Sequence, residues 1–153
     1  RDVDPGAGVA VSAQDVSFND PAYPNINNVA QALLFLLTIA RETTATFTRQ
    51  NVTDGQPYLN IGSVSSEDTG FINSGTALIT RVTIGRVDID QATLELLVND
   101  VVVDEFTTSA EKTAFGPLLI PLADLDMVAV RRKAGGPSMT SVVFTATVNQ
   151  GTN

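Results

Sequence analysis

The sequence of 153 residues contains no cysteine, no histidine and no tryptophan. Without cysteine no disulfide bond can form, and without cysteine or histidine most zinc and other soft-metal sites are excluded. Histidine is also the usual catalytic base near neutral pH, so a nucleophile would need a carboxylate, Lys112 or Lys133 as its partner. We therefore predict that the protein is not an enzyme and that it binds no cofactor and no transition metal.

Positive charge is scarce as well. Lysine and arginine number 9 against 17 aspartates and glutamates, which gives a formal net charge of −8. Nucleic acids and anionic membranes repel such a chain, so we predict that it binds neither. The apolar run at residues 29–40 is shorter than the about 20 residues that cross a bilayer, so we expect no membrane insertion. We interpret the basic run Arg131-Arg132-Lys133 as a strand end before the turn at residues 135–137, in preference to an anion site.

Acidic residues occur in close pairs, among them Asp88 with Asp90 and Asp124 with Asp126. Such pairs offer hard oxygen ligands to calcium, but neither belongs to an EF-hand loop, which needs a glycine and a distal glutamate at set positions. We interpret them as solvated turn carboxylates. Paired carboxylates also hydrolyse glycosidic bonds, but enzymes of that kind usually add aromatic platforms for the sugar, and this sequence has two tyrosines and no tryptophan.

After residue 42, short runs of Thr, Val, Ile, Phe and Leu alternate with turns rich in Gly, Pro, Asn and Asp. Short strands at this spacing predict an all-β fold, an antiparallel β-sandwich or jelly roll. Asn99-Asp100 between two apolar runs predicts a tight hairpin. The predicted strands are 44–49, 58–64, 70–73, 77–87, 93–98, 101–106, 115–121, 127–132 and 141–148. Alternation along them places these side chains in the core: Val82, Ile84, Leu94, Leu96, Val142 and Phe144.

One helix is predicted, over residues 25–41, with Asn25, Asn27 or Asn28 as its cap and Arg41 in its last turn. Its apolar residues follow the three-four spacing of a coiled coil, and their neighbours are apolar too, so the helix must be buried on several sides. It packs either beneath its own sheet or on identical helices around an axis. We favour the second arrangement, a homotrimer. The predicted interface comprises Ile26, Val29, Leu33, Leu36, Leu37 and Ala40.

The organisation expected from these patterns has two parts. Residues 1–42 form an N-terminal arm with the trimerisation helix, and residues 43–153 form the β-sandwich domain. The short helix alone is a marginal coiled coil, so we expect the β domain to contribute to assembly.

The segment that surrounds the helix start resembles one found in phage fibre and head-fibre proteins. It reads VSFNDPAYP at residues 16–24 and NVAQAL at residues 28–33, and the resemblance extends to about residue 37. In those proteins the segment precedes a helix at a trimer axis and leads into a β-rich head. This chain departs from the pattern at Ala30-Gln31, where the family often has glutamine followed by an acidic residue, and it is more apolar after Leu33.

The resemblance implies a surface-exposed structural protein of a virion: a homotrimeric head fibre, a capsid decoration or a tail-fibre module, in contact with other capsid or tail proteins. Two alternatives remain open. The β domain could bind a host receptor or glycan, for which Tyr23 and Tyr58 are the tyrosine candidates to stack on a sugar ring. The chain could also be a non-viral trimeric surface protein similar to a spore-coat filament head.

Overall fold

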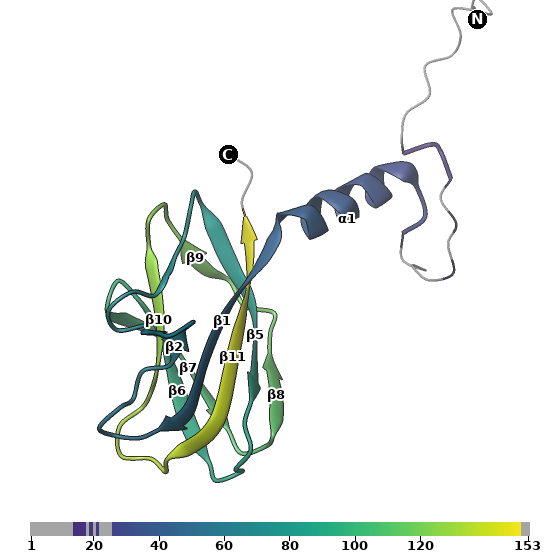
Figure 1. Ribbon diagram of the computed structural model, residues 1–153. Helices are drawn as coiled ribbons and strands as arrows, with labels where there is room; N and C mark the ends of the chain where they lie inside the picture. Colours follow the sequence, from purple (N-terminus) through teal and green to yellow (C-terminus); the bar gives the residue numbers. More distant parts are fainter. Residues whose placement is uncertain (1–13, 18, 20, 22–25, 151–153) are drawn as a thin grey trace, which may run out of the picture. The chain divides into compact units, whose positions relative to one another are not determined.

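The computed structural model describes residues 14–17, 19, 21 and 26–150, apart from the side chains of residues 35 and 37–40. The chain divides into two compact units, Arg1–Arg41 and Glu42–Asn153. The first contains helix α1 (Val29–Arg41), and the second contains the eleven strands of the described chain (Figure 1). The junction lies one residue before the predicted boundary. The predicted extended arm at residues 1–13 and the predicted cap Asn25 lie outside the described residues.

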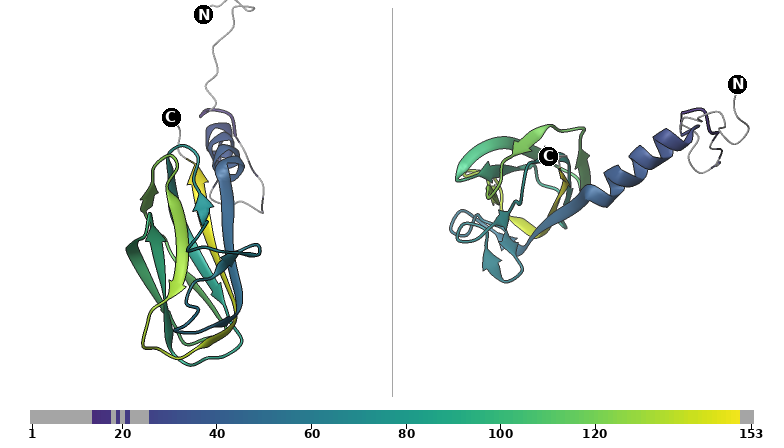
Figure 2. Two further views of the ribbon diagram at one scale, coloured as in Figure 1. Left: turned by 60° about the vertical axis from the view of Figure 1, so that its left-hand side comes forward. Right: turned by 90° about the horizontal axis from the view of Figure 1, so that it is seen from above.

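The second unit is an antiparallel β-sandwich, as the alternating pattern predicts, and with α1 it gives an all-β fold with one short helix (Figures 1 and 2). The larger sheet has the order β3-β2-β1-β11-β5-β8, with β9 also paired to β5, and the smaller has the order β4-β10-β6-β7. The strands are β1 (Glu42–Val52), β2 (Asn60–Ile61), β3 (Val64–Ser65), β4 (Phe71–Ile72), β5 (Ala77–Gly85), β6 (Ala92–Val98), β7 (Val101–Thr108), β8 (Lys112–Phe115), β9 (Ile120–Leu122), β10 (Met127–Arg132) and β11 (Met139–Gln150).

The core lies between the two sheets and is formed by alternate side chains of each strand. All six side chains that alternation places in the core are buried, none more than 1% exposed. Aromatic rings join the layers: the ring of Phe144 on β11 lies 6.1 Å from that of Phe47 and 5.8 Å from that of Phe106 on β7. The opposite parity of β1, β5 and β11 therefore faces away from the core.

Two predicted strands are each interrupted. The run 58–64 is divided at Gly62, which adopts a φ of +59° and turns the chain between β2 and β3. The run 115–121 shares only Phe115 with β8 and only residues 120–121 with β9, because residues 116–119 leave the sheet and the N–H of Leu118 donates to the carbonyl of Thr80 at 2.8 Å. The predicted hairpin at Asn99-Asp100 is confirmed, with φ values of 50° and 67° that match a tight two-residue turn.

Helix α1 starts at Val29, four residues later than predicted. Asn28 is the cap, because its side-chain oxygen accepts a hydrogen bond from the N–H of Gln31 at 2.9 Å, and the Gln31 side chain accepts one from the N–H of Asn27 at 2.9 Å. These bonds satisfy backbone groups that the first turn leaves free and so fix the start of the helix. Ile26 precedes the helix, so its assignment as the first helical interface position is wrong.

Candidate functional site

Helix α1 carries an exposed apolar surface. Leu33 and Leu36, two of the predicted interface positions, are 53% and 60% exposed, and Leu34 beside them is 64% exposed. Val29, another predicted position, is half-buried. Leu37 and Ala40 belong to the helix, but their side chains lie outside the described ones. The described helix therefore presents at least two of the six predicted interface residues on its surface.

The residues that resemble phage fibre segments contact one another at the helix start. The N–H of Val29 donates to the carbonyl of Val16 at 3.1 Å, and Ser17 forms a bridge with Asn28. The two halves of the sequence segment are therefore joined by backbone contacts at the start of α1. Phe18 and Tyr23, which lie between the halves, are outside the described residues.

A second surface was not singled out in the sequence: the face of the larger sheet that points away from the core. Threonines on neighbouring strands lie side by side there, since Thr44 pairs with Thr147 and Thr46 pairs with Thr145. Thr145 in turn pairs with Thr83 on β5. We call this outward surface of β1, β11 and β5 the threonine face. Its sequence signal is the Thr-x-Thr spacing at residues 44–48 and 145–147.

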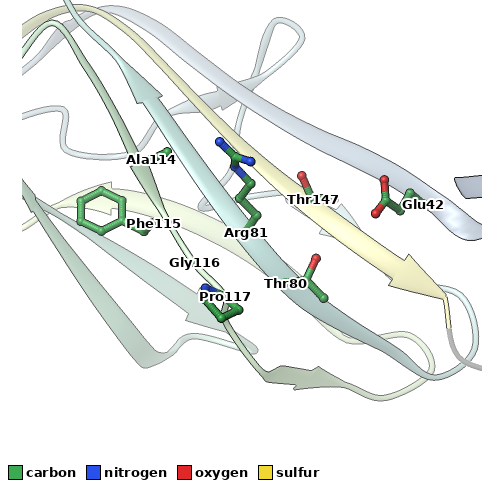
Figure 3. A pocket seen from close by; sticks show the side chains of 8 residues that line it. All are labelled: Glu42, Thr80, Arg81, Ala114, Phe115, Gly116, Pro117 and Thr147. Atoms are coloured by element: carbon green, nitrogen blue, oxygen red, sulfur yellow. The ribbon is translucent and has the colours of Figure 1, made fainter. Parts of the chain in front are cut away.

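An open groove of about 630 Å³ lies at one end of this face (Figure 3). Arg81, Thr147 and Glu42 project from the same side of the strands, and Thr80 lies beside them. The other wall is the backbone that follows β8, where the peptide bond between Gly116 and Pro117 is cis. The groove is therefore lined by two threonines, one carboxylate and one guanidinium on one side and by the apolar residues Ala114, Phe115 and Pro117 on the other.

The arrangement of Thr80 and Arg81 results from a β-bulge. Ile79 pairs with Val148 and Arg81 pairs with Thr147, so Thr80 is an extra residue on β5. A bulge of this kind re-aims side chains and bends the strand. Both Thr80 and Arg81 consequently lie outside the core, where strict alternation would direct one of them inward.

Tyr58, one of the two tyrosine candidates for a sugar platform, is half-buried and contacts Arg131. The guanidinium of Arg131 lies 5.8 Å from the centre of its ring and also donates to its hydroxyl at 3.2 Å. The Nε of Arg131 forms an ion pair with Oε1 of Glu95 at 2.7 Å. The hydrogen bond to Glu95, with a second to Tyr58, raises the pKa of Arg131 above its usual value. These groups brace strands β6 and β10 and line a hollow of about 320 Å³.

Three of the four carboxylates that were considered as calcium ligands have protein partners. Asp88 accepts from Arg86 at 3.0 Å, and Asp124 accepts from the N–H of Gly75 at 2.7 Å. Asp126 accepts from the side chain of Asn99 at 2.8 Å and from the N–H of Ala123 at 2.8 Å. Within the described chain, no three acidic side chains gather as a metal site requires. Nor does any helix of that part have the length and apolarity to cross a membrane.

No family model and no curated protein matches this sequence. Among solved structures, a β-(1,4)-mannanase of Podospora anserina (GH26-CBM35) is similar over 67% of this chain, with 9% identity and a TM-score of 0.38, and the match spans 28% of the mannanase. FLHE is similar over 72% of this chain and 98% of its own, with 12% identity and a TM-score of 0.37. At these values the likeness has no bearing on function, and the fold assignment rests on the strands themselves.

Proposed function

We propose that this chain is a non-enzymatic structural module that assembles as a homotrimer through helix α1. The observation that carries the proposal is the exposure of Leu33 and Leu36, which occupy neighbouring positions of a three-four apolar stripe. Burying a leucine side chain stabilises an assembly by about 1.5–3 kcal/mol. Leaving several such side chains in water on one helix would forfeit that free energy in every copy.

Copies of the same helix are the partner that this surface fits best. A stripe at three-four spacing is self-complementary, because each of its side chains packs into a space between side chains of an identical helix. The described part of α1 has Arg41 as its charged side chain, in the last turn, so the rest of its surface has no charge to recognise a charged partner. The wide apolar surface fits three helices better than the narrow seam of a two-helix coil.

The segment at residues 16–37 supports a place on the surface of a phage particle, as a head fibre, a capsid decoration or a tail-fibre module. It resembles the segment that begins a trimer-axis helix in those proteins, and its two halves are hydrogen-bonded to each other at the start of α1. A spore-coat-like surface protein would use the same helix and differs from this proposal in its origin. Detection of the chain in purified phage particles by mass spectrometry separates the two.

The assembly is tested by measuring mass in solution. Light scattering during gel filtration should give three times the 16.1 kDa of one chain at micromolar concentration. A monomer mass would overturn the proposal and assign the apolar helix to contacts within its own chain.

A further inference from the structure

We infer that the threonine face, at and beside the groove around Arg81, binds an acidic polysaccharide whose sugar units carry carboxylates. The inference concerns the β-sandwich alone and does not rest on the assembly proposed above. It starts from the sign of the charge on this surface.

The surface differs in charge from the rest of the molecule. A second hollow of about 400 Å³, lined by Thr83, Lys112 and Ala114, adjoins the groove through Ala114, which lines both. The charged residues in the two linings are Glu42, Arg81 and Lys112, a net charge of +1, whereas the chain carries −8. An anionic ligand repelled by the rest of the protein therefore meets a favourable potential here.

The two cations are free to bind a ligand. Neither Arg81 nor Lys112 takes part in an ion pair or a side-chain hydrogen bond with the described residues. The other basic side chains of the β-sandwich have protein partners, as Arg49, Arg86, Arg131, Arg132 and Lys133 show. Arg81 and Lys112 lie on the same face of the sheet, whereas the paired basic residues stabilise the fold.

Their spacing favours a chain over a single sugar. Lys112 pairs with Gly85, which lies four residues beyond Arg81 on β5. At about 3.3 Å per residue, the backbone positions of the two cationic residues are roughly 13 Å apart along the strand direction. One terminal acidic sugar cannot reach both, whereas a polysaccharide with repeated carboxylates can place one against each.

The side chains beside the cations suit sugar hydroxyls: Thr83 lies between Arg81 and Lys112 along β5, and Thr145 and Thr147 lie on β11, on the opposite side of β5 from Lys112. Thr83, Thr145 and Thr147 each offer a hydroxyl that both donates and accepts hydrogen bonds. The aromatic residue in the groove lining, Phe115, is half-buried, and its ring points away from Arg81 (Figure 3) and packs on Phe106 with ring centres 5.0 Å apart. Without stacking, charge-assisted bonds from Arg81 to a carboxylate must supply the recognition, because they are about twice as strong as bonds between neutral groups.

The test is titration calorimetry of the full chain with a six-unit oligogalacturonate at low salt. We expect binding that weakens when NaCl is raised, since the contacts are ionic. Arg81→Ala and Lys112→Ala should each weaken binding at least tenfold. Thr147→Val, which keeps the shape and removes the hydroxyl, should weaken it about threefold. Lys133→Ala is the matched control: it removes the same charge from an exposed residue paired with Glu105 and should change binding less than twofold.

Several outcomes would overturn the inference. One is the absence of binding to the oligogalacturonate at millimolar concentration. Another is an affinity of Arg81→Ala equal to that of the unmodified protein, which would show that the site lies elsewhere. Equal affinity for neutral cello-oligosaccharides would remove the role of the carboxylate, and equal affinity for a poly-glutamate peptide would show a general response to negative charge. Circular dichroism of each variant establishes that it is folded before its binding is compared.

Discussion

Arg86 and Arg132 are almost fully buried, although arginine is among the residues that proteins usually keep at the surface. Both guanidiniums bond to groups at strand ends and in loops: Arg86 donates to the carbonyl of Thr108 at 2.9 Å, and Arg132 donates to that of Gly136 at 2.6 Å and pairs with Asp54. The Nε of Arg132 is buried without a hydrogen-bond partner among the described residues. Both residues tie loops to strand ends. The sequence marks Arg132 as one of three basic residues at a strand end, which is confirmed, but its charge gives no signal of burial.

The side chain of Leu96 on β6 shows what the alternating pattern does predict. It faces the core with no exposed surface and pairs across the smaller sheet with Val130. Leu96→Ala should lower the free energy of unfolding by about 2–5 kcal/mol, because it removes buried carbon atoms and leaves a cavity. Urea denaturation measures this change. A loss below about half a kcal/mol would place Leu96 in solvent and refute the register.

At the scale of elements, the sequence predicts strands best where alternation and turn chemistry agree. Strand β10 has the predicted bounds, and the hairpin after β6 lies at the predicted dipeptide. The predictions of the two interrupted strands fail at Gly62, whose positive φ turns the chain, and at Pro117, which has no N–H to continue the ladder, because periodicity registers neither feature. The bulge at Thr80 is not predicted either, because it inserts one residue without changing the composition of β5.

The hairpin between β6 and β7 offers a gain in stability. Asp100 has a φ of 67°, a conformation that costs free energy for any residue with a side chain, and it is exposed. Asp100→Gly should therefore raise the free energy of unfolding by about 0.5–1 kcal/mol, because asparagine-glycine is a preferred pair for such turns. Asn99 should be left unchanged, since its side chain bonds Asp126 and the N–H of Met127. Thermal melting of the two proteins provides the measurement, and a lower melting temperature would contradict this account of the turn.

Helix α1 was predicted as an element, and its start was predicted too early because three asparagines compete for the cap. Leu33→Asp tests its role as an interface, since it would bring like charges together in an apolar axis at a cost of several kcal/mol per ion. We expect light scattering to show monomers, or the variant to fail to fold if helix and sandwich fold together. Thr38→Asp is the control: Thr38 and Gln31 are the polar residues in the middle of the helix sequence and share one heptad position away from the apolar stripe, so the trimer should stay intact. A trimer that survives Leu33→Asp would exclude the helix axis.

For the whole molecule, the fold class followed from the sequence and the threonine face did not. The alternation of apolar and polar residues indicates which side chains are buried. Every β-sandwich has this alternation along its strands, so the pattern predicts the fold class. Which outward residues lie side by side depends on strand order, and Thr44, Thr147 and Arg81 become neighbours because β11, the last strand, lies between β1 and β5. Local patterns contain no information about that pairing.

The charge of the whole chain leads to a prediction about salt. Each copy carries −8, so a trimer brings like charges together, and the apolar contacts of α1 must exceed that repulsion. Raising NaCl from 0.05 to 0.5 M shortens the range of the repulsion to less than about 8 Å, so the trimer should dissociate at a lower protein concentration. Binding of oligogalacturonate should respond in the opposite direction, because salt screens an attraction there. Light scattering over a dilution series at both salt concentrations measures the first effect.

Near pH 4.2, where the net charge vanishes, the salt dependence of assembly should shrink. Dissociation by salt at neutral pH would instead show that ion pairs between copies hold the assembly together.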